Sequence, residues 1–205
     1  MALKVDAGRT SSDPRGLHDW ESREYVDAWI ADDVTEDDQR RPFLRRVVED
    51  LPVDRDRPIR VLDVGGGYGV LSREVLDALP RAEVVLQDLS EAMLSHARER
   101  LADAGGRITF VQADFRDPGW PAAVGGPFDA VVSSLAIHNV RQPDLIRQVY
   151  LAIGGVVAPG GCFVNIDNMA PADVPVQLEW FREAGFARVE CLHQDRFRMV
   201  LAGYR

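Results

Sequence analysis

Three aspartates close three successive apolar segments of the chain, and a glycine-rich stretch follows the first of them. Asp63 lies within "VLDVGGGYG", Asp88 closes "EVVLQD" and Asp114 follows "RITFVQA". A carboxylate at the position of Asp88 can accept hydrogen bonds from both hydroxyls of a ribose. Asp114 can accept one from an adenine amino group, while the backbone N–H of Phe115 donates to the ring. These acids and the glycines together predict a bound nucleoside.

The spacing of the glycines distinguishes between two kinds of cofactor. Gly65, Gly67 and Gly69 alternate with other residues. The G-x-G-x-x-G fingerprint of dinucleotide sites would instead place its third glycine at Val70. Asp63 stands just before the glycines and would repel a pyrophosphate, so it suits a ligand that carries positive charge. A tight turn between a strand and a helix, without a ligand, is the alternative explanation of such a stretch.

One histidine of the sequence is placed where it could handle a substrate proton. His138 follows the apolar segment "FDAVVSSLAI" and is the best-placed candidate for a general base, although in "LAIHNV" it can equally be a structural histidine. Tyr25 shares one face of the first predicted helix with Trp20 and Trp29, where the rings either cover a ligand or pack the helix onto the domain. We expect Tyr25, His138 and Asn168 to contact the substrate.

The composition disfavours several classes of function. Lys4 is the only lysine among 205 residues, which argues against a P-loop, a Schiff base and bound pyridoxal phosphate. The formal net charge of −9 disfavours nucleic acid as a partner. The two cysteines lack CxxC spacing, no apolar run is long enough to span a membrane, and the N-terminus has no signal-peptide core. We therefore expect a cytoplasmic protein without a membrane partner.

The elements that must position these residues alternate regularly. Residues 1–18 are polar and aperiodic, which predicts a mobile arm, and residues 19–52 contain two helical segments that predict a cap. From residue 59 to 205, strand-like and helical segments alternate, which implies parallel strands with helices on both faces of the sheet. Residues 19–205 thus form one domain. Its first five strand-like segments are "IRVLDV", "EVVLQDL", "RITFVQADF", "PFDAVVSSLAI" and "GGCFVNID".

The end of the chain departs from this alternation. Gly154 and Gly155 weaken the helix that begins at about Pro143. After the helix "VQLEWFREAG", the segments "FARVECLHQ" and "RFRMVLAGYR" are joined by a turn too short for a crossover, so they should pair antiparallel. The fold class is therefore α/β, doubly wound, with a mostly parallel sheet. A ligand site belongs at the carboxyl ends of its strands, next to the first strand.

Together these segments resemble the class I, Rossmann-like methyltransferases that depend on S-adenosylmethionine. "LDVGGGYG" resembles the first motif of the family, "LQDLSEAML" the second, "VQADF" the third and "FDAVVSSLAIHN" the fourth. The resemblance implies a seven-stranded sheet of order 3-2-1-4-5-7-6 with an antiparallel last strand. It implies S-adenosyl-L-methionine as cofactor and S-adenosyl-L-homocysteine as product. The expected cofactor-binding residues are Asp63, Gly65, Gly66, Gly67, Gly69, Asp88, Leu89, Met93, Asp114, Phe115 and Ser134.

The function that the resemblance implies is in-line methyl transfer to a small-molecule acceptor, by a monomer or a homodimer. Positioning of the acceptor supplies most of the acceleration, and His138 removes a proton where the acceptor is a hydroxyl or a protonated amine. One departure from the family lies between the fifth strand and the last helix. Only "NMAPADVP" stands where small-molecule members often insert a helical segment. The acceptor pocket is then open, or a partner completes it, or the protein has little activity.

Three alternatives stay open. "IDNMA" resembles the Asp–Asn pair of magnesium-dependent methyltransferases, with Asp167 and Asn168 as ligands. Such enzymes need a further acid after the fourth strand, which is missing, so we expect no metal. A nicotinamide oxidoreductase would need Tyr-x-x-x-Lys, and no lysine follows Tyr150. The third alternative is a non-catalytic protein that binds the cofactor and a partner.

Overall fold

The structure is a computed structural model that describes residues 18–168 and 172–205. The mobile arm predicted over residues 1–18 lies outside the described residues, except for His18. The strands are β1 (Ile59–Val64), β2 (Ala82–Asp88), β3 (Ile108–Gln112), β4 (Phe128–Ser134), β5 (Val157–Asn168), β6 (Arg188–Gln194) and β7 (Arg198–Tyr204).

These strands form one sheet of order β3-β2-β1-β4-β5-β7-β6. Neighbouring strands from β3 across to β5 pair in parallel, whereas β7 pairs antiparallel with both β5 and β6. The predicted fold class and strand order are therefore confirmed. Because the parallel strands all end at one edge of the sheet, the side chains that follow β1, β2 and β4 come together there.

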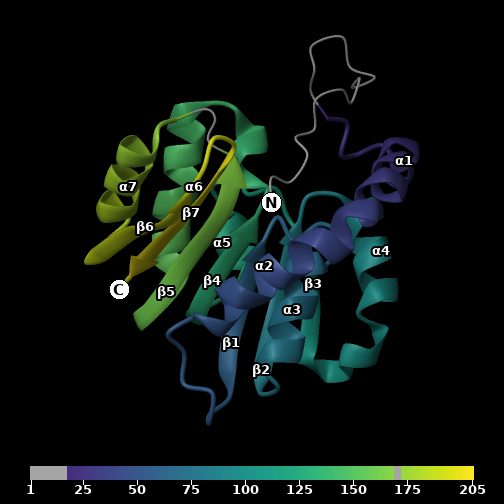
Figure 1. Cartoon of the computed structure of the whole chain (residues 1–205), viewed down its shortest axis with the longest axis horizontal. Coiled ribbons are helices and arrows are strands. Elements are labelled where there is room, and N and C mark those ends of the chain that lie inside the picture. The colour runs from purple at the N-terminus through teal and green to yellow at the C-terminus, as the bar shows by residue number, and fades with distance from the viewer. Residues whose placement is uncertain (1–17, 169–171) are drawn as a thin grey trace.

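Helices cover both faces of the sheet (Figure 1). One apolar cluster packs α2, α3 and α4 against one face, and a second packs α5, α6 and α7 against the other. Because both faces of the sheet are covered, residues 61–64 of β1 and 161–167 of β5 are buried without alternation. The helices are α1 (Arg23–Asp33), α2 (Asp37–Glu49), α3 (Val70–Ala78), α4 (Glu91–Arg100), α5 (Trp120–Val124), α6 (Pro143–Val156) and α7 (Val174–Glu183), with short 3-10 turns at Val34–Glu36, Ala102–Arg107 and Ile137–Val140.

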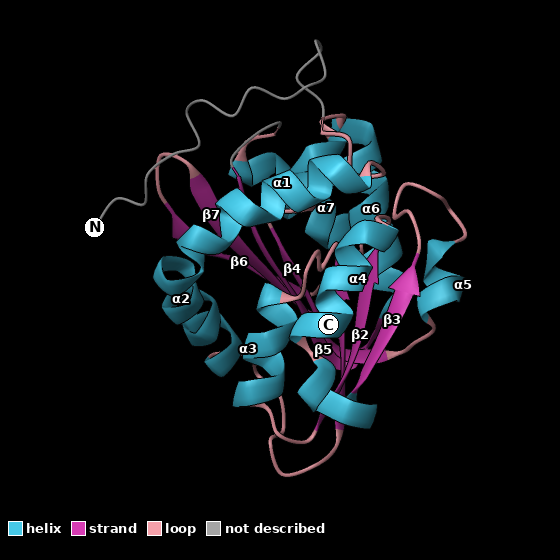
Figure 2. Cartoon of the chain, turned by 90° about the vertical axis from the view of Figure 1, so that its right-hand side faces the viewer, coloured by secondary structure: helices cyan, strands magenta, loops and turns pink. Residues whose placement is uncertain are grey.

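The first helix lies over the edge of the sheet where the parallel strands end. Figure 2 shows α1 crossing the end of the molecule toward which β3 points. Val26 of α1 is fully buried in the core. Oδ1 of Asp27, the next residue, is 2.6 Å from Nε2 of His96 in α4. The side chain of Ser22 accepts a hydrogen bond from the N–H of Tyr25 and caps the helix. Residues near the start of the chain are thereby held above the strand ends.

One local expectation from the sequence is wrong, and one glycine has a packing role that the sequence did not indicate. Helix α6 continues through Gly154 and Gly155 to Val156. A Cβ on Gly154 would lie 2.1 Å from the carbonyl oxygen of Ala184, so this glycine allows α6 to pack closely against the end of α7. The expected third strand also ends earlier, at Gln112, which leaves Asp114 in the following loop.

Candidate functional site

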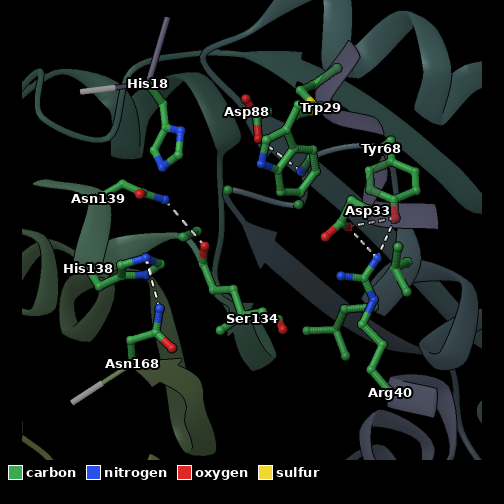
Figure 3. Close-up of a pocket in the computed structure, with 18 of the residues that line it drawn as sticks. His18, Trp29, Asp33, Arg40, Tyr68, Asp88, Ser134, His138, Asn139 and Asn168 are labelled. Carbon is green, nitrogen blue, oxygen red and sulfur yellow. Dashed lines mark hydrogen bonds and ion pairs between the residues drawn. The ribbon is translucent and has the colours of Figure 1, made fainter. Parts of the chain in front are cut away.

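A cavity of about 770 Å³ opens at the carboxyl ends of β1, β2 and β4. Figure 3 shows it between His138 and Asn168 on one side and Asp33, Arg40 and Tyr68 on the other. Many of the residues that the sequence singles out line this one space. They are Asp63, Gly65, Gly66, Gly67, Asp88, Leu89, Met93, Phe115, Ser134, His138 and Asn168.

The glycine bend forms the floor of the cavity. Gly65 and Gly67 have φ angles of 64° and 55°, in the left-handed region that favours glycine. A Cβ on Gly65 would lie 2.4 Å from the Cβ of Ala136, which follows β4. The N–H of Gly67 donates to Oδ2 of Asp88 at 2.9 Å. The bend is thus packed directly against the segment after β4 and tied to the end of β2.

Asp88 presents a carboxylate at the end of β2. Its Oδ1 accepts a hydrogen bond from the N–H of Ser90 at 2.9 Å, and its Oδ2 accepts the one from Gly67. Burial raises the pKa of Asp88, and these backbone donors oppose that rise. Each oxygen keeps a lone pair beyond its single backbone bond. The side chain can therefore still accept hydrogen bonds from two hydroxyls of a ligand.

Asp63 is fully buried beneath the bend and incompletely paired. Its Oδ2 accepts a hydrogen bond from the Ser72 hydroxyl at 2.6 Å, but its Oδ1 has no hydrogen-bond partner among the described residues. Burial, and then the nearby charge of Asp88, raises the pKa of Asp63 to about 7. An unpartnered buried carboxylate oxygen is costly, and a cationic ligand would offset that cost. The site thus favours a ligand with positive charge at this point.

We expect the titration of Asp63 to make cofactor binding depend on pH. A ligand ammonium group favours the carboxylate, so affinity for S-adenosylhomocysteine should rise by up to about tenfold per pH unit as pH increases toward 7, and level off above. In the cofactor-free protein, the raised pKa of Asp63 means that its protonated form favours the folded state. This contribution to the free energy of unfolding is complete below about pH 4 and is lost as the pH rises through about 7. Isothermal titration calorimetry between about pH 5 and 8 measures the affinity.

The variant D63N provides the control for this pH dependence. An amide does not titrate, so the affinity of D63N should stay flat over the same pH range, at a lower value because the negative charge is missing. A wild-type affinity that does not change with pH, or a D63N variant that retains the wild-type slope, would contradict the assignment of the titrating group to Asp63.

Three residues singled out from the sequence lie outside the lining of this cavity. Asp114 forms an ion pair with Arg116, 2.6 Å from Nη2 to Oδ2. Gly69, with φ 86°, begins α3, and a Cβ there would meet Leu101 at 2.7 Å. Tyr25 contacts the rings of His18 and Trp20. Their contacts with cofactor or substrate stay predictions.

His138 belongs to a hydrogen-bonded group at the ends of β4 and β5. Its Nδ1 is 2.6 Å from Oδ1 of Asp167, and its backbone N–H donates to Oδ2 of Asp167 at 2.9 Å. Its Nε2 is 3.1 Å from Nδ2 of Asn168. With Nδ1–H donating to the carboxylate, Nε2 keeps the lone pair that a general base needs. The side chain of Asp167 is 2% exposed, whereas that of His138 is 22% exposed. Of these two side chains, the imidazole is therefore the one that is accessible from the cavity.

A local turn puts His138 in this place. The N–H of Leu135 donates to the carbonyl of Ile166 at 2.8 Å, which extends the pairing of β4 with β5 by one residue. Leu135 then adopts φ 54°, a value that is uncommon for a residue with a Cβ. The fully buried Ile137 anchors the following 3-10 turn. His138 is thereby held over the end of β5, next to Asp167.

The structure adds residues to the cavity that the sequence did not single out as binding residues. His18 and Trp29 both line it. Arg198, at the start of β7, also lines it. The sequence signal for Trp29 was that it shares one face of the first helix with Trp20 and Tyr25. Arg198 gave no sequence signal, because only the register of the last two strands brings it to the cavity.

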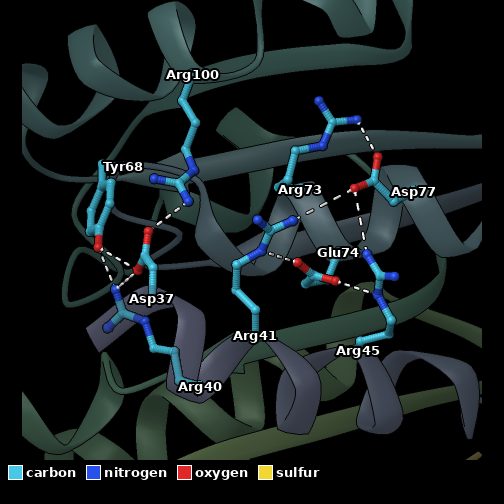
Figure 4. Close-up of polar contacts among 9 residues, drawn as sticks. All are labelled: Asp37, Arg40, Arg41, Arg45, Tyr68, Arg73, Glu74, Asp77 and Arg100. Atoms are coloured by element: carbon cyan, nitrogen blue, oxygen red, sulfur yellow. Dashed lines mark hydrogen bonds and ion pairs between the residues drawn. The ribbon is translucent and has the colours of Figure 1, made fainter. Parts of the chain in front are cut away.

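A buried polar cluster links α2 to the glycine bend (Figure 4). The Tyr68 hydroxyl donates toward Asp33 at 2.8 Å and Asp37 at 3.0 Å, and Arg40 contacts all three groups. Arg100 of α4 pairs with Asp37 at 2.7 Å. Tyr68 directly follows Gly67, so the cluster fixes the bend from the side of the N-terminal helices.

Removal of the Tyr68 hydroxyl should destabilise the protein. In Y68F, two buried carboxylates lose the single hydroxyl proton that they share and Arg40 loses an acceptor. Hydrogen bonds to charged groups each contribute about 1.5–3 kcal/mol. We expect the free energy of unfolding, measured by urea denaturation, to fall by about 2 kcal/mol. Y204F is the control, because the Tyr204 hydroxyl makes no side-chain hydrogen bond within the described chain, and it should change the free energy by less than about 0.5 kcal/mol. Equal effects of the two changes would contradict the role of the cluster.

Comparison with known proteins shows a similarity to methyltransferases. Residues 61–161 match a family model described as a methyltransferase domain. The chain is 35% identical to the ubiquinone/menaquinone biosynthesis C-methyltransferase UbiE of Ectopseudomonas mendocina over 118 residues. This matched region is 56% of this chain and 43% of that protein. These matches support a class I methyltransferase that depends on S-adenosylmethionine. It spans about half the length of the curated relatives that it matches.

Two solved structures share the fold. An O-methyltransferase family protein from Burkholderia thailandensis is similar with a TM-score of 0.70 and 24% identity, over 91% of this chain and 60% of that one. The protein PigF, solved with SAH, is similar with a TM-score of 0.69 and 19% identity, over 91% of this chain and 60% of that one. Among the described residues, no helix is both long and apolar enough to cross a membrane.

Proposed function

We propose that the chain transfers a methyl group from S-adenosylmethionine to a hydroxyl group of a small molecule. The observation that carries this proposal is that the His138–Asp167 pair and the glycine bend face the same cavity. The first supplies a base and the second a place for a nucleoside. The family fits methyl transfer, and the pair of His138 and Asp167 favours an acceptor that must lose a proton.

The cavity residues fit the cofactor that the family uses. Gly65, Gly66 and Gly67 leave the floor without side chains, and Asp88 offers acceptors for two ribose hydroxyls. The unpartnered oxygen of Asp63 suits a positively charged group. Leu89, Met93, Phe115 and Ser134 line the same space and are proposed to contact the nucleoside. Gly69 ends the glycine bend, and Asp114 lies at the beginning of the loop after β3. We propose that these two loops, rather than the side chain of Asp114 or Gly69 itself, contact the nucleoside.

In the proposed reaction, the chain's own residues position the acceptor and accept its proton. The cofactor supplies an activated methyl group when bound, so positioning is the main requirement, and it contributes about 7–11 kcal/mol in well-oriented reactions. The acceptor hydroxyl replaces the amide of Asn168 as hydrogen-bond donor to Nε2 of His138. Asp167 holds the ring in the tautomer with Nδ1 protonated and stabilises the imidazolium that forms.

The wider biological setting is part of the same proposal. The net charge of −9 supports a small-molecule acceptor rather than nucleic acid. Cys162 and Cys191 are both free thiols, which supports the reducing environment of the cytoplasm. We propose one domain over residues 19–205, with residues 19–52 as a cap, acting as a monomer or a homodimer.

The test measures S-adenosylhomocysteine formed from S-adenosylmethionine, first with the small-molecule fraction of a cell extract and then with a panel of hydroxylated compounds. We expect turnover that survives EDTA, because both oxygens of Asp167 already accept hydrogen bonds from His138. Cofactor binding without any turnover would favour a non-catalytic binding protein. Loss of activity in EDTA that magnesium restores would favour the metal-dependent alternative. Binding of NAD but not of S-adenosylmethionine would overturn the proposal altogether.

A further inference from the structure

The turn between β6 and β7 brings a cationic side chain to the cavity. Arg196, Phe197 and Arg198 all line it. Arg196 stays exposed, with its guanidinium 5.3 Å from the centre of the Phe197 ring. Arg198 is partly buried. Its backbone N–H donates to the carboxylate of Asp195 and its backbone carbonyl accepts from the N–H of Asp195, but its side chain makes no hydrogen bond or ion pair within residues 18–168 and 172–205. Its five guanidinium donors have no acceptor there.

The register of the sheet places Arg198 next to the proposed base. Arg198 on β7 is the antiparallel partner of Asn168 on β5. Directly opposed residues of an antiparallel pair have Cβ atoms about 4.5–5.5 Å apart and project from the same face. Asn168 in turn contacts Nε2 of His138 at 3.1 Å. Arg198, Asn168 and His138 are therefore neighbours along the cavity wall.

The carboxylates nearest to Arg198 do not neutralise it. Asp33 is engaged by Arg40 and Tyr68, and Asp195 accepts hydrogen bonds from backbone N–H groups of the turn. Glu36 acts on Arg198 only through its charge at a distance and forms no ion pair with it among the described residues. Burial, and then the charge of Arg40, lowers the pKa of Arg198. By contrast, Arg40 and Arg100, which are also buried or partly buried, both pair with Asp37.

We propose that Arg198 binds an anionic oxygen group of the acceptor, so that the substrate is a hydroxy acid whose hydroxyl reaches His138. This inference rests on the proposed function of the site. A planar guanidinium matches a carboxylate with two parallel N–H···O hydrogen bonds, which is stronger and more directional than a single neutral hydrogen bond. One end of the acceptor is then fixed by charge and the other is presented to the base.

The experiment compares two probes of nearly equal shape, 4-hydroxybenzoate and its neutral amide 4-hydroxybenzamide. Their dissociation constants are measured by calorimetry on the protein saturated with S-adenosylhomocysteine. A hydrogen-bonded charge pair should favour the carboxylate by about tenfold or more in the wild type. R198M should bind both probes equally, and R198K should keep part of the preference. R46M removes an exposed arginine outside the cavity with the same change in net charge, and it should match the wild type.

The outcomes separate the two proposals. Equal affinities in the wild type, a preference that survives in R198M, or no binding of either probe would overturn the assignment of Arg198. Retained affinity for S-adenosylhomocysteine in R198M shows that the variant is folded. If the wild type fails to bind S-adenosylhomocysteine, the proposed function itself fails. If it binds S-adenosylhomocysteine and forms it from S-adenosylmethionine but does not prefer the carboxylate, only the acceptor class is wrong.

Discussion

Replacement of Gly65 by alanine should remove nearly all affinity for S-adenosylmethionine. The new Cβ would lie 2.4 Å from that of Ala136 and 3.4 Å from the ring of Phe115, and the φ angle of 64° disfavours any side chain. Left-handed strain and overpacking each cost about 1–3 kcal/mol. The bend or the segment after β4 must shift, and both of them line the cavity. We expect the dissociation constant, measured by calorimetry, to rise on the order of 100-fold.

A second glycine provides the matched control for this change. Gly106 has no atom within 4 Å of an added Cβ and lies in the exposed turn before β3. G106A should therefore bind the cofactor as the wild type does. Circular dichroism shows whether G65A keeps the fold, since the α/β core on both sides of the sheet is untouched. If folded G65A bound the cofactor with wild-type affinity, the glycine bend would not be the cofactor site.

The fold could be predicted from the sequence because each of its signals is local. The apolar segment of β1, the glycines after it and the short link between β6 and β7 each restrict the backbone within a few residues. Their order along the chain leaves few topologies for a parallel sheet. Gly154 shows the limit of such local reasoning. Its lack of a side chain weakens an isolated helix, but in the structure it allows α6 to approach Ala184.

The site could be predicted only in part, because its contacts join segments that are far apart in the sequence. His138 was recognisable from its place after β4, but Asp167 is 29 residues away and was considered only as a metal ligand. The pairing depends on the left-handed turn at Leu135, for which leucine gives no signal. The place of Arg198 depends on the register between β5 and β7. Such registers are set by the packing of whole strands rather than by one residue.

The second large effect is expected for His138. In H138Q, a side chain of similar size still fills the space beside Asp167 and Asn168 but does not accept a proton. General-base catalysis contributes about 10²- to 10⁴-fold, so we expect kcat, measured with the acceptor found in the screen, to fall by that factor. Affinity for S-adenosylhomocysteine should stay unchanged, because the glycine bend and Asp88 are not in contact with the imidazole. H193Q changes an exposed histidine at the edge strand β6 and should keep wild-type kcat.

The pH dependence of the rate separates a base from a side chain that only shapes the pocket. Protonation of a general base lowers kcat/KM on the acid side of the profile. That decline should be present in the wild type and absent from the residual activity of H138Q. D167N tests the positioning role of Asp167, since an amide has one acceptor oxygen and cannot accept from both Nδ1–H and the backbone N–H of His138, and it does not stabilise the imidazolium. It should lower kcat more than it changes KM. If H138Q kept both the wild-type kcat and the acid-side decline, His138 would not be the base, and an acceptor that is already unprotonated, such as a thiolate, would replace the proposed hydroxyl.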